Sequence, residues 1–88
     1  MARKWIVQIE NNKYQVEAIY GEFFSYGSGK AFVDGKMVDE WGMSGWGMIP
    51  KERTFEIAGK KAMLKREGFF TFNMDLFVPE ATKVTRVK

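Results

Sequence analysis

Residues 30–39 read KAFVDGKMVD, in which the pair Asp34-Gly35 separates two short runs that each combine apolar residues with a charged one. An Asp-Gly pair between two such runs is the strongest short signal for a β-hairpin with a two-residue loop. Such a loop fixes the register of the two strands. The expected partners are Phe32 opposite Met37, Ala31 opposite Val38 and Lys30 opposite Asp39.

Three further loops predict hairpins by the same argument. They are Asn11-Asn12, Ala58-Gly59 and the three-residue loop Arg66-Glu67-Gly68, and a less regular turn is expected around Pro79-Glu80-Ala81. The first loop is expected to set Glu10 opposite Lys13, Ile9 opposite Tyr14, Val7 opposite Val16 and Trp5 opposite Ala18. The second is expected to set Glu56 opposite Lys61 and Phe55 opposite Ala62, and the third Leu64 opposite Phe70 and Ala62 opposite Phe72. These registers keep apolar pairs apart from charged ones, which is typical of a sheet with one buried face.

Alternation with a period of two recurs along the chain, whereas no long segment keeps an apolar period of 3.6, so the predicted class is all-β. Eight strands are expected near residues 4–10, 13–20, 29–34, 36–41, 52–57, 60–65, 69–78 and 82–87. Consecutive antiparallel strands at this spacing predict an antiparallel β-sandwich built from sequential hairpins, with a small β-barrel as the alternative. Residues 69–78 carry one charge and apolar groups on both faces, so we expect that strand in the centre of a sheet, paired on both sides.

The composition fits one domain over residues 1–88 with a single hydrophobic core. The chain has 8 Phe, 3 Tyr and 3 Trp but no Cys, so large side chains rather than disulfides must stabilise that core. The first residues form no apolar leader, and no run approaches the ~18 apolar residues of a membrane span, so we expect a cytoplasmic protein without membrane contact. The 14 Lys and Arg are interspersed with 11 Asp and Glu, which favours a solubilising surface.

The residues that most enzymes rely on are few in this chain. It has no His and no Cys, so it lacks both the usual base near neutral pH and a thiolate nucleophile. Residues 27–30, GSGK, resemble a phosphate-binding loop, but that motif needs a glycine where Phe24 stands and a hydroxyl residue where Ala31 stands. Soft zinc ligands and a calcium-binding loop are also missing. We therefore expect a protein that is not an enzyme and that binds neither a cofactor nor a metal.

The stretch from Trp41 to Pro50, WGMSGWGMIP, contains the triplet Trp-Gly-Met twice. Tryptophan dominates many binding hot spots and methionine repacks easily, so this stretch and the aromatic loop at 23–27 could form a contact surface for a protein partner, including a second copy. The predicted contact residues are Phe23, Phe24, Tyr26, Trp41, Met43, Trp46 and Met48. The alternative is that Trp41 ends a strand in the core while Trp46 and Met48 close one end of the sandwich.

A basic cluster suggests a second function class, the binding of nucleic acid or another polyanion. It consists of Lys60, Lys61, Lys65 and Arg66. Basic side chains beside aromatic ones would suit single-stranded nucleic acid. The competing interpretation is a solvated strand face, because Glu56 is expected opposite Lys61.

Several short motifs occur in an order that is similar to a known family. They are Tyr20-Gly21, Ser28-Gly29-Lys30, Val33-Asp34-Gly35-Lys36, Glu40-Trp41, Phe55-Glu56-Ile57-Ala58-Gly59, Lys61-Ala62 and an aromatic strand that ends at Leu76, with an early Trp5. In these features residues 5–78 resemble one domain of Fas apoptotic inhibitory molecule. The spacing on both sides of residues 28–30 differs from that family, Val78-Pro79-Glu80 stands where a Gly-Lys turn is expected, and the family usually carries two such domains. The resemblance implies a non-catalytic antiparallel β-sandwich that acts through protein contacts.

Overall fold

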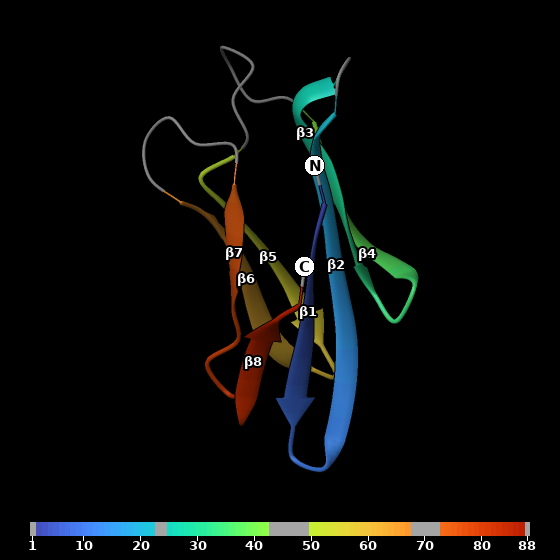
Figure 1. The fold of residues 1–88 in the computed structure, drawn as a ribbon, viewed down its shortest axis with the longest axis vertical. Coiled ribbons are helices and arrows are strands. Elements are labelled where there is room, and N and C mark those ends of the chain that lie inside the picture. The colour runs from blue at the N-terminus through green and yellow to red at the C-terminus, as the bar shows by residue number, and fades with distance from the viewer. Residues whose placement is uncertain (1, 23–24, 43–49, 68–72, 88) are drawn as a thin grey trace.

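The protein folds into two antiparallel β-sheets that face each other. The computed structural model describes residues 2–22, 25–42, 50–67 and 73–87, with the backbone alone described for residues 21, 22 and 25–27. The strands are β1 (Ala2–Ile9), β2 (Asn12–Glu22), β3 (Ser25–Val33), β4 (Lys36–Trp41), β5 (Glu52–Ile57), β6 (Lys60–Arg66), β7 (Met74–Phe77) and β8 (Lys83–Arg86). Their order is β4-β3-β2-β1-β8 in a five-stranded sheet and β5-β6-β7 in a three-stranded sheet (Figure 1). The predicted antiparallel β-sandwich of eight strands is confirmed, and the two sheets do not close into a barrel.

One hydrophobic core fills the space between the two sheets. Along β1 the burial alternates with a period of two, so that Trp5, Val7 and Ile9 point inward. The other strands supply inward residues in the same way, and the largest fully buried side chains are Trp5, Tyr20, Ile57, Leu64, Met74, Val7 and Val16. No charged or polar residue among the described ones is fully buried, so apolar burial carries the stability of the core.

Trp41 reaches this core because Gly29 lies opposite it on β3. A Cβ atom at position 29 would lie 2.7 Å from Trp41 Cε2 and 2.7 Å from the carbonyl oxygen of Ile19, which is closer than van der Waals contact permits. Glycine at this position therefore lets the indole ring lie against the backbone of β3.

Two of the predicted hairpin loops are confirmed. Asp34 and Gly35 have φ angles of 50° and 82°, and Ala58 and Gly59 have φ angles of 52° and 79°. Two consecutive residues with positive φ match the twist of the flanking strands, which is why Asp-Gly is favoured in such loops. The expected partners across the second loop, Glu56 with Lys61 and Phe55 with Ala62, are confirmed.

A β-bulge changes the register beyond the Asp34-Gly35 loop. Phe32 pairs with Met37 as expected, but the register then shifts, so that Ala31 pairs with Asp39 rather than with Val38. Lys30 in turn pairs with Glu40 rather than with Asp39. A bulge adds one residue to one strand and so exchanges the faces of the residues that follow it. Here it turns the side chains of Asp39 and Trp41 inward.

The predicted register of the first hairpin is wrong. The loop consists of Glu10 and Asn11, with Glu10 at a φ of 56°, and Ile9 pairs with Asn12. Lys13 consequently lies opposite Gln8 rather than Glu10, and the remaining expected pairs fail in the same way: Ile9 with Tyr14, Val7 with Val16 and Trp5 with Ala18. Both registers place the same residues inward because they differ by two along the partner strand, so the apolar pattern could not separate them.

The predicted position of the seventh strand is also wrong. It spans Met74–Phe77, and Leu64 on β6 pairs with Leu76 rather than with Phe70. Phe70 and Phe72 lie outside the described residues. Among the described strands β7 pairs with β6 alone and forms an edge of its sheet, whereas β6 is central.

Side chains close the outer edge of β7. The Met74 amide donates to the Tyr20 hydroxyl (3.1 Å), and Arg3 Nη1 donates to the Met74 carbonyl (2.9 Å). The Leu76 amide donates to Asp75 Oδ1 (2.9 Å). An edge strand whose backbone groups are already bonded offers little to another strand, so an apolar strand can stand at an edge here.

The predicted turn around Pro79-Glu80-Ala81 leads from β7 to β8. Its backbone hydrogen bond runs from the Ala81 amide to the Val78 carbonyl (3.0 Å). Pro79 stands second in the turn, a position that the fixed φ of proline favours. The turn takes the chain from the three-stranded sheet to the edge of the five-stranded one, beside β1.

Candidate functional site

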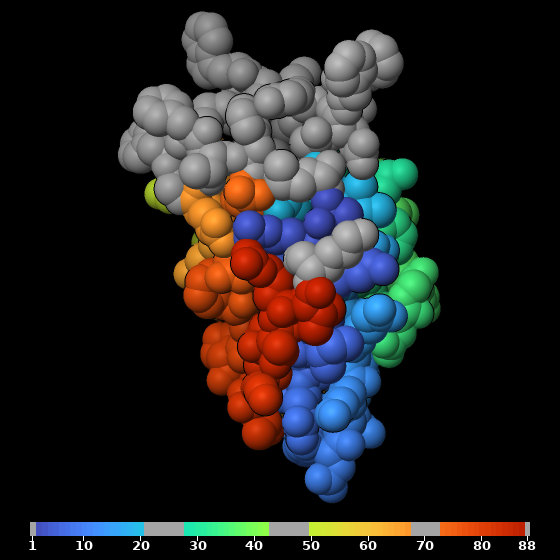
Figure 2. All heavy atoms as spheres, in the orientation of Figure 1, coloured from blue at the N-terminus to red at the C-terminus, as the bar shows by residue number. Residues whose placement is uncertain are grey.

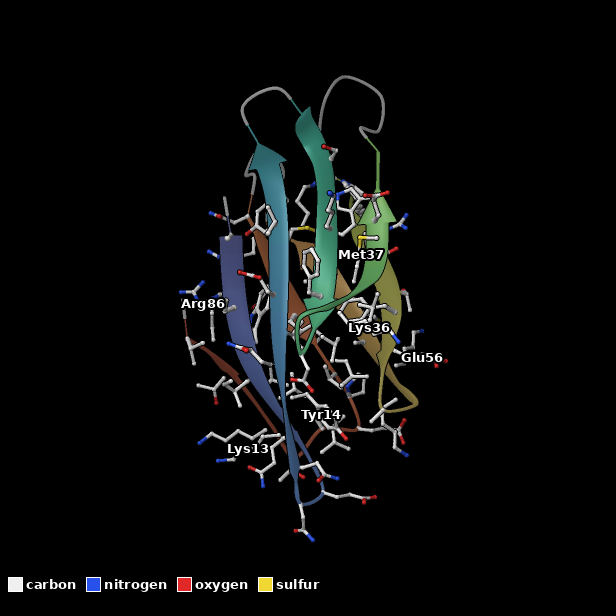
Figure 3. The ribbon with its side chains drawn as sticks, turned by 90° about the vertical axis from the view of Figure 1, so that its right-hand side faces the viewer. Lys13, Tyr14, Lys36, Met37, Glu56 and Arg86 are labelled. Atoms are coloured by element: carbon white, nitrogen blue, oxygen red, sulfur yellow. The ribbon has the colours of Figure 1, made fainter. Side chains whose placement is uncertain are left out.

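Several apolar side chains lie on the outer face of the five-stranded sheet, the face that does not pack against the core. Phe32 lies between inward-facing neighbours on β3 and pairs with Met37 on β4. The Met37 side chain is 51% exposed and Val38 37%. Figure 3 looks onto this sheet from outside and shows Met37 beside β4. We call the set Ile19, Phe32, Met37 and Val38 the outer apolar patch.

A hollow adjoins this patch at one end of β3 and β4. The residues that line it are Ile19, Ser28, Gly29, Lys30, Phe32, Glu40, Trp41 and Gly42. Two members of the outer apolar patch, Ile19 and Phe32, are therefore part of its wall. Concave surfaces with apolar walls and a few polar groups are the usual form of binding sites.

The bulge in β4 builds this site. It directs Asp39 inward, where Arg53 of β5 donates two hydrogen bonds to the carboxylate, from Nε (3.0 Å) and Nη2 (2.8 Å). The Arg53 guanidinium also lies 5.8 Å from the centre of the Trp41 ring. These hydrogen bonds raise the pKa of Arg53. A two-pronged pair of this kind is geometrically specific and ties β4 of one sheet to β5 of the other.

Charges near the patch are paired within the same face. Lys4 Nζ lies 3.7 Å from Glu17 Oε2, and Lys30 Nζ lies 3.8 Å from Glu40 Oε2. Exposed pairs of this kind add at most about 1 kcal/mol to stability. Their effect on the surface is larger, because each of these lysines is neutralised by a glutamate beside it.

Of the seven predicted contact residues, the structure describes the side chain of one, Trp41. Trp41 is 5% exposed and lies in the core, as the alternative interpretation expected, so its predicted role as an exposed contact residue is corrected. Trp41 is also one of the residues that line the hollow. Phe23, Phe24, Met43, Trp46 and Met48 lie outside the described residues, and for Tyr26 only the backbone in β3 is described.

The four residues of the basic cluster lie on β6 but do not form one patch. Lys61 and Lys65 are exposed and alternate with the buried Ala62 and Leu64, whereas Lys60 and Arg66 stand at the two ends of the strand with the opposite parity. At about 3.3 Å per residue the ends of this strand are about 20 Å apart.

Acidic residues accompany the lysines of this cluster. Lys60 Nζ lies 3.6 Å from Glu80 Oε1, and Lys61 pairs with Glu56 across the sheet. Lys65 stands between Glu52 and Asp75, and its Nζ lies 5.4 Å from the centre of the Phe77 ring. A phosphate backbone would have to compete with these neighbours.

The residues that the structure describes contain no group of three or more His, Cys, Asp or Glu side chains that could hold a metal ion. Within the same residues no helix is long and apolar enough to cross a membrane. Comparisons of the chain with protein-family models, with curated proteins and with solved structures find no match in any of the three.

The outer apolar patch was missed in the sequence although a signal for it is present. The Asp34-Gly35 loop predicts the pair of Phe32 and Met37, and the structure shows this pair on the outer face. Ala31 and Val33 flank Phe32, so β3 is apolar on both faces, and one of those faces has to be the outer one. A strand with two apolar faces in a sandwich indicates either a covered outer face or a binding surface.

Proposed function

We propose that this protein is a non-enzymatic interaction module that binds another protein through the outer apolar patch. The observation that carries the proposal is the exposure of Met37 and Val38 beside a hollow lined by Ile19 and Phe32. Water-exposed apolar groups that gather around a concave surface are the usual mark of an interaction site. The resemblance to a Fas apoptotic inhibitory molecule domain implies the same class of function.

The charges around the patch indicate what kind of protein would bind. Lys4 and Lys30 are each paired with a glutamate on the same face. A nucleic acid requires an excess of positive charge, which these two paired lysines do not offer. A protein surface with an uncharged apolar centre is the complementary partner, and a cytoplasmic location is part of the proposal.

Site-specific photocrosslinking tests this proposal. A benzophenone side chain placed at Glu40, which lines the hollow, is expected to give a discrete crosslinked product in cells that produce the protein. The product should disappear when Met37→Ser and Val38→Ser are added, because the patch then loses its exposed apolar groups. Val87→Ser is the matched control, since Val87 is equally exposed (53%) but belongs to the C-terminal segment next to β8.

A benzophenone at Glu56, on the outer face of the other sheet, measures random collisions. The proposal fails if the Glu56 probe yields the same product, or if the product survives the double serine substitution. Because Met37 and Val38 are exposed, their substitution should change the free energy of unfolding by less than about 1 kcal/mol. An unfolding curve of the variant therefore separates loss of binding from loss of fold.

A further inference from the structure

We propose that the outer edge of β8 binds an extended peptide segment of another protein in which acidic and apolar residues alternate. Such a peptide would add a strand to the five-stranded sheet next to β8. The site is separate from the outer apolar patch, which lies on β2, β3 and β4. Figure 2 shows the residues of β8 at the surface between those of β7 and β1.

Of the four strands that form sheet edges, β8 is the one best suited to accept another strand. β4 contains a bulge and is held to β5 by the pair of Arg53 and Asp39. β5 carries the exposed acids Glu52 and Glu56, and the backbone of β7 is bonded to side chains. Among the described strands β8 pairs only with β1, and no bulge interrupts that pairing over its four residues.

The hydrogen bonds to β1 show which backbone groups of β8 point outward. The Val87 amide donates to the Lys4 carbonyl (2.9 Å). The backbone groups of Val87 therefore point toward β1, and so do those of Thr85, two residues earlier. Backbone groups of alternate residues in an antiparallel pair point to opposite sides. The amide and carbonyl groups of Val84 and Arg86 therefore point away from β1 and can bond an added strand.

Two hollows flank this edge and can take side chains of the added strand. One, of about 420 Å³, is lined by Trp5, Asp75, Leu76, Val84 and Arg86. The other, of about 370 Å³, is lined mainly by apolar residues: Met63, Lys65, Leu76, Phe77, Val78, Pro79 and Val84. They share Leu76 and Val84, so they adjoin each other between β7 and β8. Alternate side chains of an added strand would face them, and apolar side chains would fit best.

The charge around β8 selects the other side chains of the peptide. Lys13 and Lys83 lie on either side of Gln8 across three neighbouring strands and share its outward face, whereas Arg86 pairs with Trp5 and lines the first hollow. In the part of the chain that the structure describes none of these three cations belongs to an ion pair. Acidic side chains on the outward face of the peptide complement Lys83 and Lys13, whereas β8 of a second copy would bring further positive charge to this edge.

The probe for the test is the capped hexapeptide acetyl-Glu-Val-Glu-Val-Glu-Val-amide, titrated into the full chain and followed by NMR. We expect the largest shift changes at the amides of Val84 and Arg86, and hydrogen exchange there slowed by roughly tenfold at saturation. The peptide residues that bond Val84 and Arg86 have side chains on the inward face, so they are the valines. N-methylation of the valines should abolish binding, whereas N-methylation of the glutamates, whose amides point outward, should leave it intact.

Charge and side-chain requirements are tested with matched variants. Lys83→Glu should weaken binding by at least about tenfold, whereas Lys36→Glu, on the opposite edge strand, should change it less than twofold. Equal binding of a Glu-Gly hexapeptide would show that charge alone attracts the probe and would overturn the proposal. Slowed exchange on β5, concentration-dependent self-association without peptide, or no shift changes at about millimolar peptide would each do the same. None of these readouts depends on Met37 or Val38, so this proposal and the proposed function can fail separately.

Discussion

β7 and β8 are joined by a short turn, and each forms an edge of its sheet, yet the two edges are built differently. The backbone of β7 is bonded to Tyr20, Arg3 and Asp75. The outward backbone groups of β8 have no such partners among the described residues, and the strand carries Lys83 and Arg86 instead.

The two edges differ because unpaired backbone groups would have different consequences beside the side chains of each strand. Met74 and Leu76 are buried and Phe77 is 46% exposed, so an open β7 edge would combine unpaired backbone groups with apolar side chains. That combination promotes aggregation. β8 has one partly buried Val84 between polar and charged residues, so charge protects its edge without closing it. An edge protected by charge still accepts a strand of opposite charge.

The largest expected effect comes from opening the β7 edge with Arg3→Met. Arg3 Nη1 donates to Glu67 Oε1 (2.8 Å) and to the Met74 carbonyl (2.9 Å), and methionine can donate to neither. We expect the free energy of unfolding, measured by urea denaturation, to fall by about 2–3 kcal/mol. The neighbouring substitution Lys4→Met removes only a partly exposed ion pair and should cost less than about 1 kcal/mol. Equal losses in the two variants would mean that Arg3 does not close the edge.

Tyr20→Phe is expected to have a smaller effect, with a distinctive pH dependence. It removes the acceptor of the Met74 amide and should lower the free energy of unfolding by about 1–2 kcal/mol near neutral pH. Burial raises the pKa of Tyr20 above its ordinary value of 10.0. The contribution of the protonated hydroxyl is therefore fully present below pH 10 and is lost as the pH rises toward the pKa of the folded state.

Denaturation curves of both proteins over a range of alkaline pH check this expectation. Above pH 10 the unfolded wild-type chain gains stability from the ionised Tyr20, and the folded chain does not until its higher pKa is reached. The difference between wild type and Tyr20→Phe should shrink there, by up to about 1.4 kcal/mol per pH unit. A difference that stays constant with pH would contradict the burial of this hydroxyl in the β7 edge.

The sequence predicted the faces of strands more reliably than their partners. The alternation of apolar and polar residues correctly predicted that Trp5, Val7 and Ile9 point inward, because the face on which a side chain lies depends on its own strand alone. The partner of Val7 depends on whether the loop starts at Glu10 or Asn11, and both choices satisfy the same apolar pattern. Only the Asp-Gly and Ala-Gly loops specified their register, since a residue that accepts positive φ stood in each.

The site was less predictable because it depends on a bulge and on pairing between distant residues. No residue type in β4 marks the extra residue that turns Asp39 and Trp41 inward. The closure of β7 by Arg3 and Tyr20 joins residues more than fifty positions apart in the chain. The basic character of β8 was visible in the sequence, but its position at an open edge was not.

The smallest expected effect tests whether the β8 edge is open as described. Proline has no amide hydrogen, and within sheets it is tolerated where the lost amide would face away from the partner strand. The Arg86 amide points away from β1, so Arg86→Pro should change the free energy of unfolding by less than about 1 kcal/mol. The Thr85 amide faces β1, so Thr85→Pro should cost more, by about one hydrogen bond, or roughly 1 kcal/mol. Urea denaturation of the two variants, made at adjacent positions of the same strand, measures this difference.

Because Arg86→Pro also removes an amide that an added strand would bond, it should abolish binding of the Glu-Val peptide in a protein that remains folded. The reverse order of stabilities would place the amides of Val84 and Arg86 toward β1 and leave the outer edge without the groups that bind a peptide.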